Sequence, residues 1–273
     1  MTASIIDCHN HIFDPQRFPY GVDNRFHPDG PEINTTSQFA QLLDANGVSH
    51  ALIVGPNSGY GLDNGALLDA VAHGRGRFKG VAVVPNDVSI AQLADLKSKG
   101  MVGIAINPTF DGIAYSRDIG PLLSKLEDLD LFLQIQVEGD MLIDLWPLIS
   151  SFRGRMLFDH CGRPVPKNGL DQPGFRKLLD LAQAGRTAVK LSGHIKFSDE
   201  LYPYADTWPF VRALVDAFTL DNCMWGSDWP CLRARERIGY GQLLRLTESL
   251  FPDDSDRRKL FWNTPARLFG FAE

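Results

Sequence analysis

Three histidines and one aspartate stand at positions where their side chains can meet. His9 and His11 lie two residues apart near the start of the chain, and residues at i and i+2 of an extended segment point to the same side. His160 and Asp228 each come at or just after the end of an apolar run farther along. Imidazoles beside a carboxylate can polarise a carbonyl group, take a proton from water or hold a divalent metal ion.

Short β-rich apolar runs alternate with amphipathic helical stretches, which is typical of βαβ units and a parallel sheet. The runs that we predict as strands are Ser4–Asp7, Ala51–Val54, Gly80–Val84, Gly103–Ile106, Leu131–Val137, Met156–Asp159, Ala188–Ser192 and Cys223–Asp228. The predicted helices are Phe39–Ala45, Gly65–Ala72, Ile90–Lys99, Gly120–Leu129, Met141–Phe152, Phe175–Ala184, Phe210–Phe218 and Gln242–Leu250. No linker interrupts the alternation, so the sequence predicts a single α/β domain over residues 1–273.

Eight such units in a chain of this length are close to the size of a TIM barrel, about 250 residues. The histidines and Asp228 then fall at the carboxyl ends of the first, sixth and eighth strands, which share one mouth in a closed (β/α)8 barrel. An open, doubly wound sheet gives similar local signals, so periodicity alone leaves the closure open. Two irregular stretches, Tyr20–Pro31 and Lys196–Trp208, follow strand ends on the mouth side, and we expect them to cover a pocket.

A single histidine near a strand end is usually a hydrogen-bonded structural side chain, so the prediction depends on the joint pattern. His194 follows the seventh predicted strand and is a further candidate for the mouth. Asp7 and Asp159 precede site histidines, and we expect them to point to the opposite face and to bond barrel backbone. No chemistry is assigned to the remaining histidines, His27, His50 and His73.

The charge balance and the cysteines limit the partners and the location. A formal charge of −6 would repel a nucleic-acid backbone, so nucleic acid is not an expected partner. The chain has no apolar stretch of about 18 residues and Met1–Asp7 lacks signal-peptide features, so we expect no membrane contact and a cytoplasmic location. The four cysteines show no C-x-x-C spacing and are expected to be free thiols.

Four motifs, in this order and at this spacing, resemble those of the amidohydrolase superfamily. They are Asp7-Cys8-His9-Asn10-His11, Asp159-His160-Cys161-Gly162-Arg163-Pro164, Lys190-Leu191-Ser192-Gly193 and Trp225-Gly226-Ser227-Asp228-Trp229-Pro230. Over nearly its whole length the chain is similar to the branch of 2-pyrone-4,6-dicarboxylate lactonases and sugar-lactone hydrolases. The resemblance implies a distorted TIM barrel and a hydrolase that opens a lactone of a sugar acid or of a pyrone- or muconate-type acid.

The same resemblance implies roles for the site residues. Asp228 would act as general base, taking a proton from water and returning it to the leaving alkoxide. His160 and one of His9 and His11 would donate hydrogen bonds to the carbonyl oxygen. Arg163 would hold a substrate carboxylate, although a surface salt bridge would equally account for it. The other polar residues expected to line the mouth and bind substrate are Asn57, Ser58, Asn107, Gln136 and Lys196.

The sequence leaves open whether a metal takes part. We favour chemistry without a cofactor, because lactones are esters and more reactive than amides. The alternative is one divalent ion, Zn²⁺ or Mn²⁺, held by the three histidines and Asp228, and the resembling branch contains members of both kinds. A two-metal centre is not expected, since it needs a bridging Lys or Glu from a mid-barrel strand and we expect only one of Gln136 and Glu138 to point inward.

Ala105 stands where pyrone dicarboxylate lactonases tend to carry an arginine. The loss of that contact favours a hydroxylated sugar-acid lactone with one carboxylate or none. Two other functions stay open. One is a lactone isomerase, in which the substrate's own hydroxyl attacks; Tyr202–Asp206 resembles that subgroup, which usually lacks the counterpart of Asp228. The other is a catalytically silent barrel that binds a small metabolite.

Overall fold

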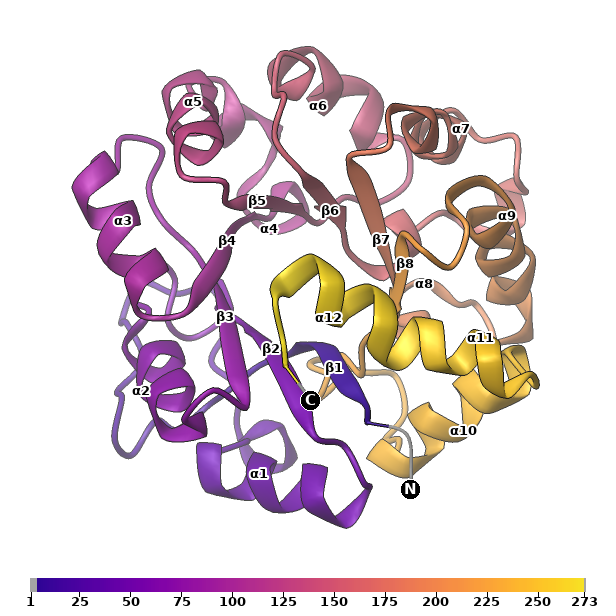
Figure 1. The fold of residues 1–273 in the computed structure, drawn as a ribbon, viewed down its shortest axis with the longest axis horizontal. Coiled ribbons are helices and arrows are strands. Elements are labelled where there is room, and N and C mark those ends of the chain that lie inside the picture. Colours follow the sequence, from indigo (N-terminus) through magenta and orange to yellow (C-terminus); the bar gives the residue numbers. More distant parts are fainter. Residues whose placement is uncertain (1–3, 273) are drawn as a thin grey trace.

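Eight parallel strands follow one another around a barrel in the order of the sequence (Figure 1). The computed structural model describes residues 4–272. The strands are β1 (Ile6–Asn10), β2 (His50–Val54), β3 (Phe78–Ala82), β4 (Met101–Ile106), β5 (Phe132–Ile135), β6 (Met156–Phe158), β7 (Thr187–Leu191) and β8 (Cys223–Trp225). The predicted barrel is therefore confirmed, and the predicted runs overlap all of these strands. The predicted domain covers residues 1–273, of which residues 1–3 and 273 lie outside the described part of the chain.

The barrel closes where β8 meets β1. The Asp228 amide donates to the His9 carbonyl oxygen at 2.7 Å, and the His11 amide donates to the Trp229 carbonyl oxygen at 2.9 Å. Gly226 lies at this junction, where an added Cβ would stand 2.8 Å from the His9 amide nitrogen, closer than side chains can approach. The close approach of the two strands rules out the open sheet and brings His9 beside Asp228.

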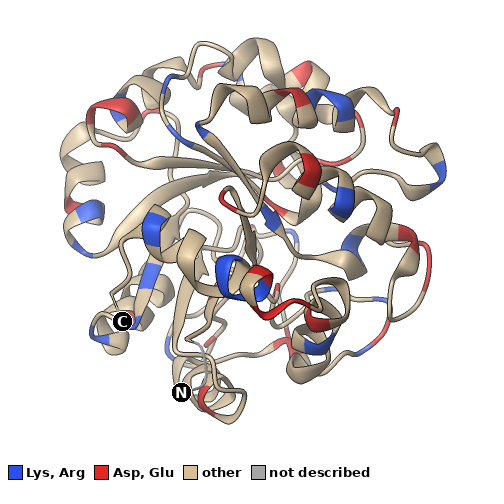
Figure 2. Cartoon of the chain, turned by 45° about the vertical axis from the view of Figure 1, so that its right-hand side comes forward, with Lys and Arg blue, Asp and Glu red and all other residues tan. Residues whose placement is uncertain are grey.

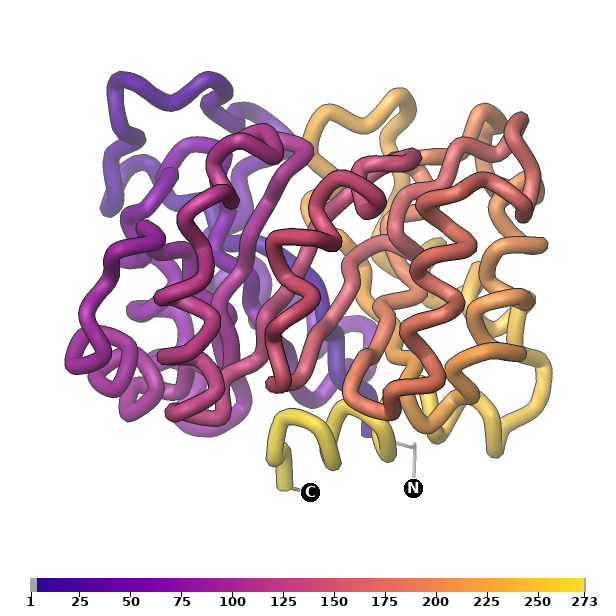
Figure 3. The backbone as a smooth tube through the Cα atoms, turned by 90° about the horizontal axis from the view of Figure 1, so that it is seen from above, coloured from indigo at the N-terminus to yellow at the C-terminus, as the bar shows by residue number. Residues whose placement is uncertain are grey.

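Helices follow the strands and cover the outside of the barrel (Figures 1 and 3). The α-helices are α1 (Thr36–Ala45), α2 (Gly65–Gly74), α3 (Ile90–Ser98), α4 (Pro108–Asp111), α5 (Gly120–Asp128), α6 (Met141–Ile149), α7 (Pro173–Asp180), α8 (His194–Phe197), α9 (Trp208–Phe218), α10 (Tyr240–Leu250), α11 (Asp254–Arg258) and α12 (Thr264–Phe269). Shorter 3-10 segments are η1 (Gly30–Glu32), η2 (Ile113–Ser116), η3 (His160–Gly162), η4 (Pro166–Asn168), η5 (Leu181–Ala184) and η6 (Ala205–Thr207), and η7 (Lys259–Asn263) is a π-helix. Basic and acidic residues are mixed over these helices (Figure 2).

Capping explains where two of the outer helices begin. The hydroxyl groups of Thr35, before α1, and Ser89, before α3, each accept a hydrogen bond from the backbone amide three residues later. The residue at that position is a glutamine in both helices, and its side-chain oxygen accepts from the backbone amide of Thr35 or Ser89. These capping boxes satisfy amide groups that the first turn of a helix leaves unpaired. No helix in residues 4–272 is long and apolar enough to cross a membrane.

The last segment of the chain, α11 to α12, was not predicted and closes the amino-terminal end of the barrel (Figures 1 and 3). Trp262, Phe269 and Phe271 are buried in one cluster with side chains from inside the barrel, such as Ile6 and Leu157. The bottom of the barrel is thus filled with apolar side chains. The open end is the one formed by the carboxyl ends of the strands, which we call the mouth.

Candidate active site

A pocket of about 430 Å³ opens at the mouth. Its walls come from the ends of several strands and the loops that follow them. The ten residues to which the sequence analysis gave a catalytic or substrate-binding role all line it, namely His9, His11, Asn57, Ser58, Asn107, Gln136, His160, Arg163, Lys196 and Asp228. The structure therefore brings the whole predicted set into one cavity, although their individual roles stay predictions.

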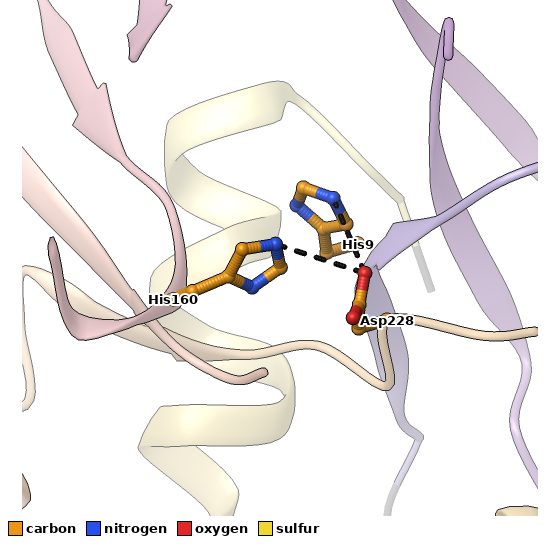
Figure 4. A group of neighbouring side chains, drawn as sticks. All are labelled: His9, His160 and Asp228. Atoms are coloured by element: carbon orange, nitrogen blue, oxygen red, sulfur yellow. Dashed lines mark ion pairs between the residues drawn. The ribbon is translucent and has the colours of Figure 1, made fainter. Parts of the chain in front are cut away.

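Three imidazoles surround the Asp228 carboxylate, two of which are drawn with it in Figure 4. Its Oδ1 atom lies 3.6 Å from His160 Nε2, 3.8 Å from His11 Nε2 and 3.9 Å from His9 Nε2. These distances exceed a hydrogen bond, so the four side chains face a common point without binding one another directly. His160 and Asp228 both adopt a positive φ, at 52° and 58°, which is backbone strain of the kind that collects at functional sites.

Asp228 is held in the ionised state. Burial alone would raise the pKa of this carboxyl group, but Lys196, His160 and His11 outweigh burial and lower the pKa below its ordinary value. Lys196 Nζ lies 3.5 Å from Asp228 Oδ2. An ionised carboxylate beside imidazoles is a group that can accept a proton from water.

The three imidazoles are neutral at neutral pH, because burial lowers the pKa of each of them and lowers those of His9 and His160 most strongly. His11 Nδ1 lies 2.9 Å from the Val54 carbonyl oxygen, which can only accept, so the proton of His11 is on Nδ1. His160 Nδ1 lies 3.0 Å from the Ser192 hydroxyl. Each ring is thus fixed by a partner behind it, with Nε2 facing Asp228.

A buried polar network lies behind His9, and the sequence did not reveal it. Lys190, whose side chain is fully buried, places Nζ 2.7 Å from Gln134 Oε1, 3.1 Å from Asp159 Oδ1 and 3.1 Å from His9 Nδ1. Gln134 Nε2 donates to Asp159 Oδ2 at 2.9 Å. The available signal was Lys190 itself, since a lysine inside an apolar strand is rarely buried unless it is paired.

The prediction that Asp159 points away from the mouth is wrong. Asp159 lines the pocket and stands 3.1 Å from His9 Nδ1, because β6 ends at Phe158 and the chain turns there into η3. Asp7 is different: it does not line the pocket and accepts from the amides of His9 and Ser227 and from the Tyr240 hydroxyl. The prediction for Asp7 is therefore confirmed.

Basic side chains surround the mouth. Arg163 Nη2 lies 2.9 Å from Glu138 Oε2, so the salt bridge foreseen as the alternative for Arg163 is present, at the edge of the pocket. Arg233 and Arg235, from the loop after β8, also line the pocket and were not predicted. Among residues 4–272, no carboxylate forms an ion pair with either guanidinium group. The Arg233 guanidinium lies over the Phe26 ring, and Arg235 donates to the Ser198 carbonyl oxygen.

Both Gln136 and Glu138 line the pocket, so the expectation that only one points inward is wrong. Residues two apart on an extended segment share a face, and β5 has in any case ended at Ile135. Gln136 donates to Thr109, and Asn107 donates to Asn57 at 3.3 Å, which fixes the amides on this wall.

The remaining candidates lie away from the pocket. His194 is buried against Thr207, with 2.8 Å between Nδ1 and the hydroxyl oxygen, and does not line it. Of the stretch Lys196–Trp208, only Lys196 does. No residue of Tyr20–Pro31 lines it, although Asn24 lines a smaller neighbouring cavity of about 180 Å³. The two stretches that were expected to cover the pocket thus contribute only Lys196 to its lining.

The donor set fits a single divalent ion. One ligand atom each from His9, His160 and Asp228 lies within 4.8 Å of the others, whereas His11 is outside this group. His9 Nε2 is buried and has no hydrogen-bond partner in the structure, so it is available to a ligand. Two imidazole nitrogens with a carboxylate oxygen suit Zn²⁺ or Mn²⁺.

A closed parallel barrel with histidines and an aspartate at the carboxyl ends of its strands is the architecture of a TIM-barrel enzyme. The chain belongs to the amidohydrolase family, whose model matches residues 6–271. This confirms the family expected from the four motifs.

Three relatives define the neighbourhood. The 4-sulfomuconolactone hydrolase of Hydrogenophaga intermedia is 31% identical over 97% of this chain and 88% of its own length. The D-galactarolactone isomerase of Agrobacterium fabrum is 26% identical over 88% of this chain and 81% of its own. The crystal structure of a Pseudomonas putida protein assigned as a 2-pyrone-4,6-dicarboxylic acid hydrolase superposes over the full length of both chains with a TM-score of 0.88 at 27% identity.

Proposed function

We propose that this protein is a hydrolase that opens the ring of a lactone, with Asp228 as general base. One observation carries the proposal: the buried Asp228 carboxylate faces the Nε2 atoms of three imidazoles at 3.6–3.9 Å in the lining of the pocket. Relatives named as lactone hydrolases support the reaction class. An ester carbonyl placed among these groups would meet both a base for water and donors for its oxygen.

In the proposed reaction, Asp228 takes a proton from a water molecule whose oxygen bonds to the lactone carbonyl carbon. The negative charge that forms on the carbonyl oxygen is stabilised by hydrogen bonds from His160 and one of His9 and His11. The bond between the carbonyl carbon and the ring oxygen then breaks, and Asp228 returns the proton to the alkoxide. The product is a hydroxy acid. A positioned base contributes roughly 10²–10⁴-fold to such a reaction.

The mouth favours a lactone that carries an acidic group. Arg163 stands at the wall of the pocket, and its Nε is buried without a hydrogen-bond partner in the structure. Arg233 and Arg235 add positive charge on the loop after β8. A planar guanidinium matches the two oxygens of a carboxylate or sulfonate. The amides of Asn57, Asn107 and Gln136 supply contacts for hydroxyl or carbonyl groups.

A divalent ion, when bound, would be held by His9, His160 and Asp228 and would supply Lewis-acid polarisation of the carbonyl oxygen. The base and the hydrogen-bond donors of the proposed reaction are side chains of the protein itself. We further propose a cytoplasmic location and a small-molecule substrate; the four unpaired cysteines support the location.

The test is a pH-indicator screen of sugar-acid, muconate and pyrone lactones, with neutral lactones of the same ring size as a comparison. We expect proton release with at least one acidic lactone, and a decrease in kcat of about 10²–10⁴-fold for Asp228→Asn. Asp216→Asn, on the exposed face of α9, is the matched control and should keep full activity. A silent binding barrel would release no proton with any lactone, and its affinity for ligand would be the same in Asp228→Asn.

Labelled water separates hydrolysis from isomerisation. Hydrolysis in H₂¹⁸O places one ¹⁸O atom in the product acid, whereas attack by the substrate's own hydroxyl places none. We expect incorporation, because Asp228 is present and ionised. Product free of label would assign the chain to the isomerase reaction named for the Agrobacterium fabrum relative.

A further inference from the structure

Lys190 is a buried charged residue next to the site that the reaction above does not use. Its side chain comes from β7, has no exposed surface and reaches His9 Nδ1, on the side of the ring away from Asp228. Its ammonium group has three hydrogens, and three acceptor atoms stand within 3.1 Å of Nζ. These acceptors are Gln134 Oε1, Asp159 Oδ1 and His9 Nδ1.

We propose that Lys190 is a positioning residue that fixes His9 with its proton on Nε2, so that His9 and not His11 donates to the carbonyl oxygen. The inference rests on the proposed lactone hydrolysis for its catalytic meaning only. The position of the proton itself follows from the donors and acceptors around the ring.

The count of donors decides the tautomer. If His9 Nδ1 accepts from Lys190, all three ammonium hydrogens are bonded and Asp159 still accepts from Lys190 and Gln134. If Nδ1 instead donates to Asp159, the third hydrogen of Lys190 faces an N–H group, and a buried unpaired donor is costly. With the proton on Nε2, the lone pair of Nδ1 lies 3.1 Å from Asp159 Oδ1, but the Lys190 ammonium lies 3.1 Å from both atoms and donates to each of them. The donor count therefore favours the proton on Nε2.

His9 and His11 therefore have opposite tautomers. His11 gives its Nδ1 proton to the Val54 carbonyl oxygen, which leaves its Nε2 as an acceptor. His9 presents an Nε2–H that is buried and has no partner in the structure. An unpaired donor aimed at the point shared with Asp228 is what a developing oxyanion requires. His9 thus has the role that the sequence left open between the two.

The same tautomer opposes metal binding. A metal ion binds the lone pair of a nitrogen, and the Nε2 of His9 offers one only when the ring proton moves to Nδ1. Such a proton would have to be donated to Asp159, against the ammonium of Lys190. Removal of Lys190 should therefore free Nε2 and also remove a positive charge next to the site.

Nuclear magnetic resonance measures the tautomers directly. In protein labelled with ¹⁵N-histidine at about pH 8, above the ordinary histidine pKa, the ring nitrogen shifts show which atom carries the proton. Signals are assigned by their loss in His9→Asn and His11→Asn. We expect the proton on Nε2 in His9 and on Nδ1 in His11. A proton on Nδ1 of His9 in the unmodified protein would overturn the proposal, and this result needs no Lys190 variant.

Lys190→Met keeps the length of the side chain and removes its charge and donors. We expect the His9 proton to move to Nδ1 and the calorimetric affinity for Zn²⁺ alone to rise at least about tenfold. The matched control is Lys79→Met, on β3, whose ammonium lies 5.4 Å from the Phe271 ring and touches no histidine. It should change neither quantity. A His9 proton that stays on Nε2, or an unchanged Zn²⁺ affinity, would contradict the role of Lys190.

Kinetics gives an independent readout. With a lactone that the unmodified enzyme opens, Lys190→Met should lower kcat about 10²-fold, as the loss of one oxyanion donor does, and leave KM within about threefold. A rise in KM at unchanged kcat would contradict the positioning role. If no lactone is opened at all, the proposed function fails, while the tautomers and the Zn²⁺ titration still decide the inference about Lys190.

Discussion

At the scale of single residues, the site separates charge between one base and its neutral neighbours. The neighbours of Asp228, Lys196 first among them, outweigh its burial and lower its pKa, whereas burial lowers the pKa values of His9, His11 and His160 and keeps these rings neutral. A neutral imidazole can donate one hydrogen bond without holding a full positive charge beside Lys190 or Lys196. This distribution suits a base that must accept a proton while its neighbours donate hydrogen bonds.

The pH dependence of kcat/KM tests this distribution. A lowered pKa means that each histidine stays neutral below the ordinary value of about 6.5, and that Asp228 stays ionised below about 3.9. With a lactone that does not itself titrate, we expect kcat/KM to be constant from about pH 8 to pH 6 and to fall only at lower pH. An acid limb centred at pH 6.5 or above would show that an imidazole titrates normally.

The identity of the reacting residues could be predicted from the sequence, but their supports could not. His9, His11, His160 and Asp228 stand out because their types and their places at strand ends coincide. The direction of the Asp159 side chain depends on where β6 ends, because the alternation of side chains holds only while the strand continues. Hydrogen-bond partners from β5 and β7 meet His9 only in three dimensions.

At the scale of elements, the turns after the strands aim the side chains. Gly193 lies between β7 and α8, as the residue just before the helix, and has a φ of +64°, a conformation that glycine adopts without strain. A Cβ at this position would lie 2.4 Å from His160 Nδ1. The absence of a side chain at Gly193 therefore leaves the space that the His160 ring occupies.

Gly193→Ala should displace His160 and lower kcat about 10²-fold through the loss of a donor. Gly185→Ala is a matched control, because Gly185 has a similar φ of +67° and nothing within 4 Å of an added Cβ. Both variants should lose about 1–2 kcal/mol of unfolding free energy from the left-handed conformation, measured by denaturant unfolding. Equal kcat values in the two variants would mean that the His160 position does not depend on Gly193.

The strands and outer helices were predictable because each carries its own periodic pattern. The first strand was placed too early, at Ser4–Asp7 instead of Ile6–Asn10, since the polar residues of the site interrupt the apolar run. The register also shifts between Asp7 and Asn10, which a regular alternation cannot anticipate. Elements are thus least predictable where they carry the site.

At the scale of the whole molecule, the two ends of the barrel are used differently. The mouth is polar and holds the pocket, whereas the opposite end is filled by Trp262, Phe269 and Phe271. The helix α12 has six residues, too few to show a period, and besides the adjacent η7 it contacts β1 and β8. Its place could therefore not be predicted from the local pattern.

This division predicts that the amino-terminal end stabilises the barrel without affecting catalysis. Phe269 is 4% exposed and packs on the Phe132 ring at 5.3 Å between centroids, so Phe269→Ala should lower the unfolding free energy by about 3–5 kcal/mol. Leu201, which is 66% exposed, gives the matched large-to-small control, and Leu201→Ala should change stability by less than about 0.5 kcal/mol. Below their unfolding temperatures, both variants should keep the kcat and KM of the unmodified enzyme, because Phe269 lies at the end of the barrel opposite the mouth. A change in kcat that accompanies the loss of stability in Phe269→Ala would instead show that packing at the bottom of the barrel positions the residues of the mouth.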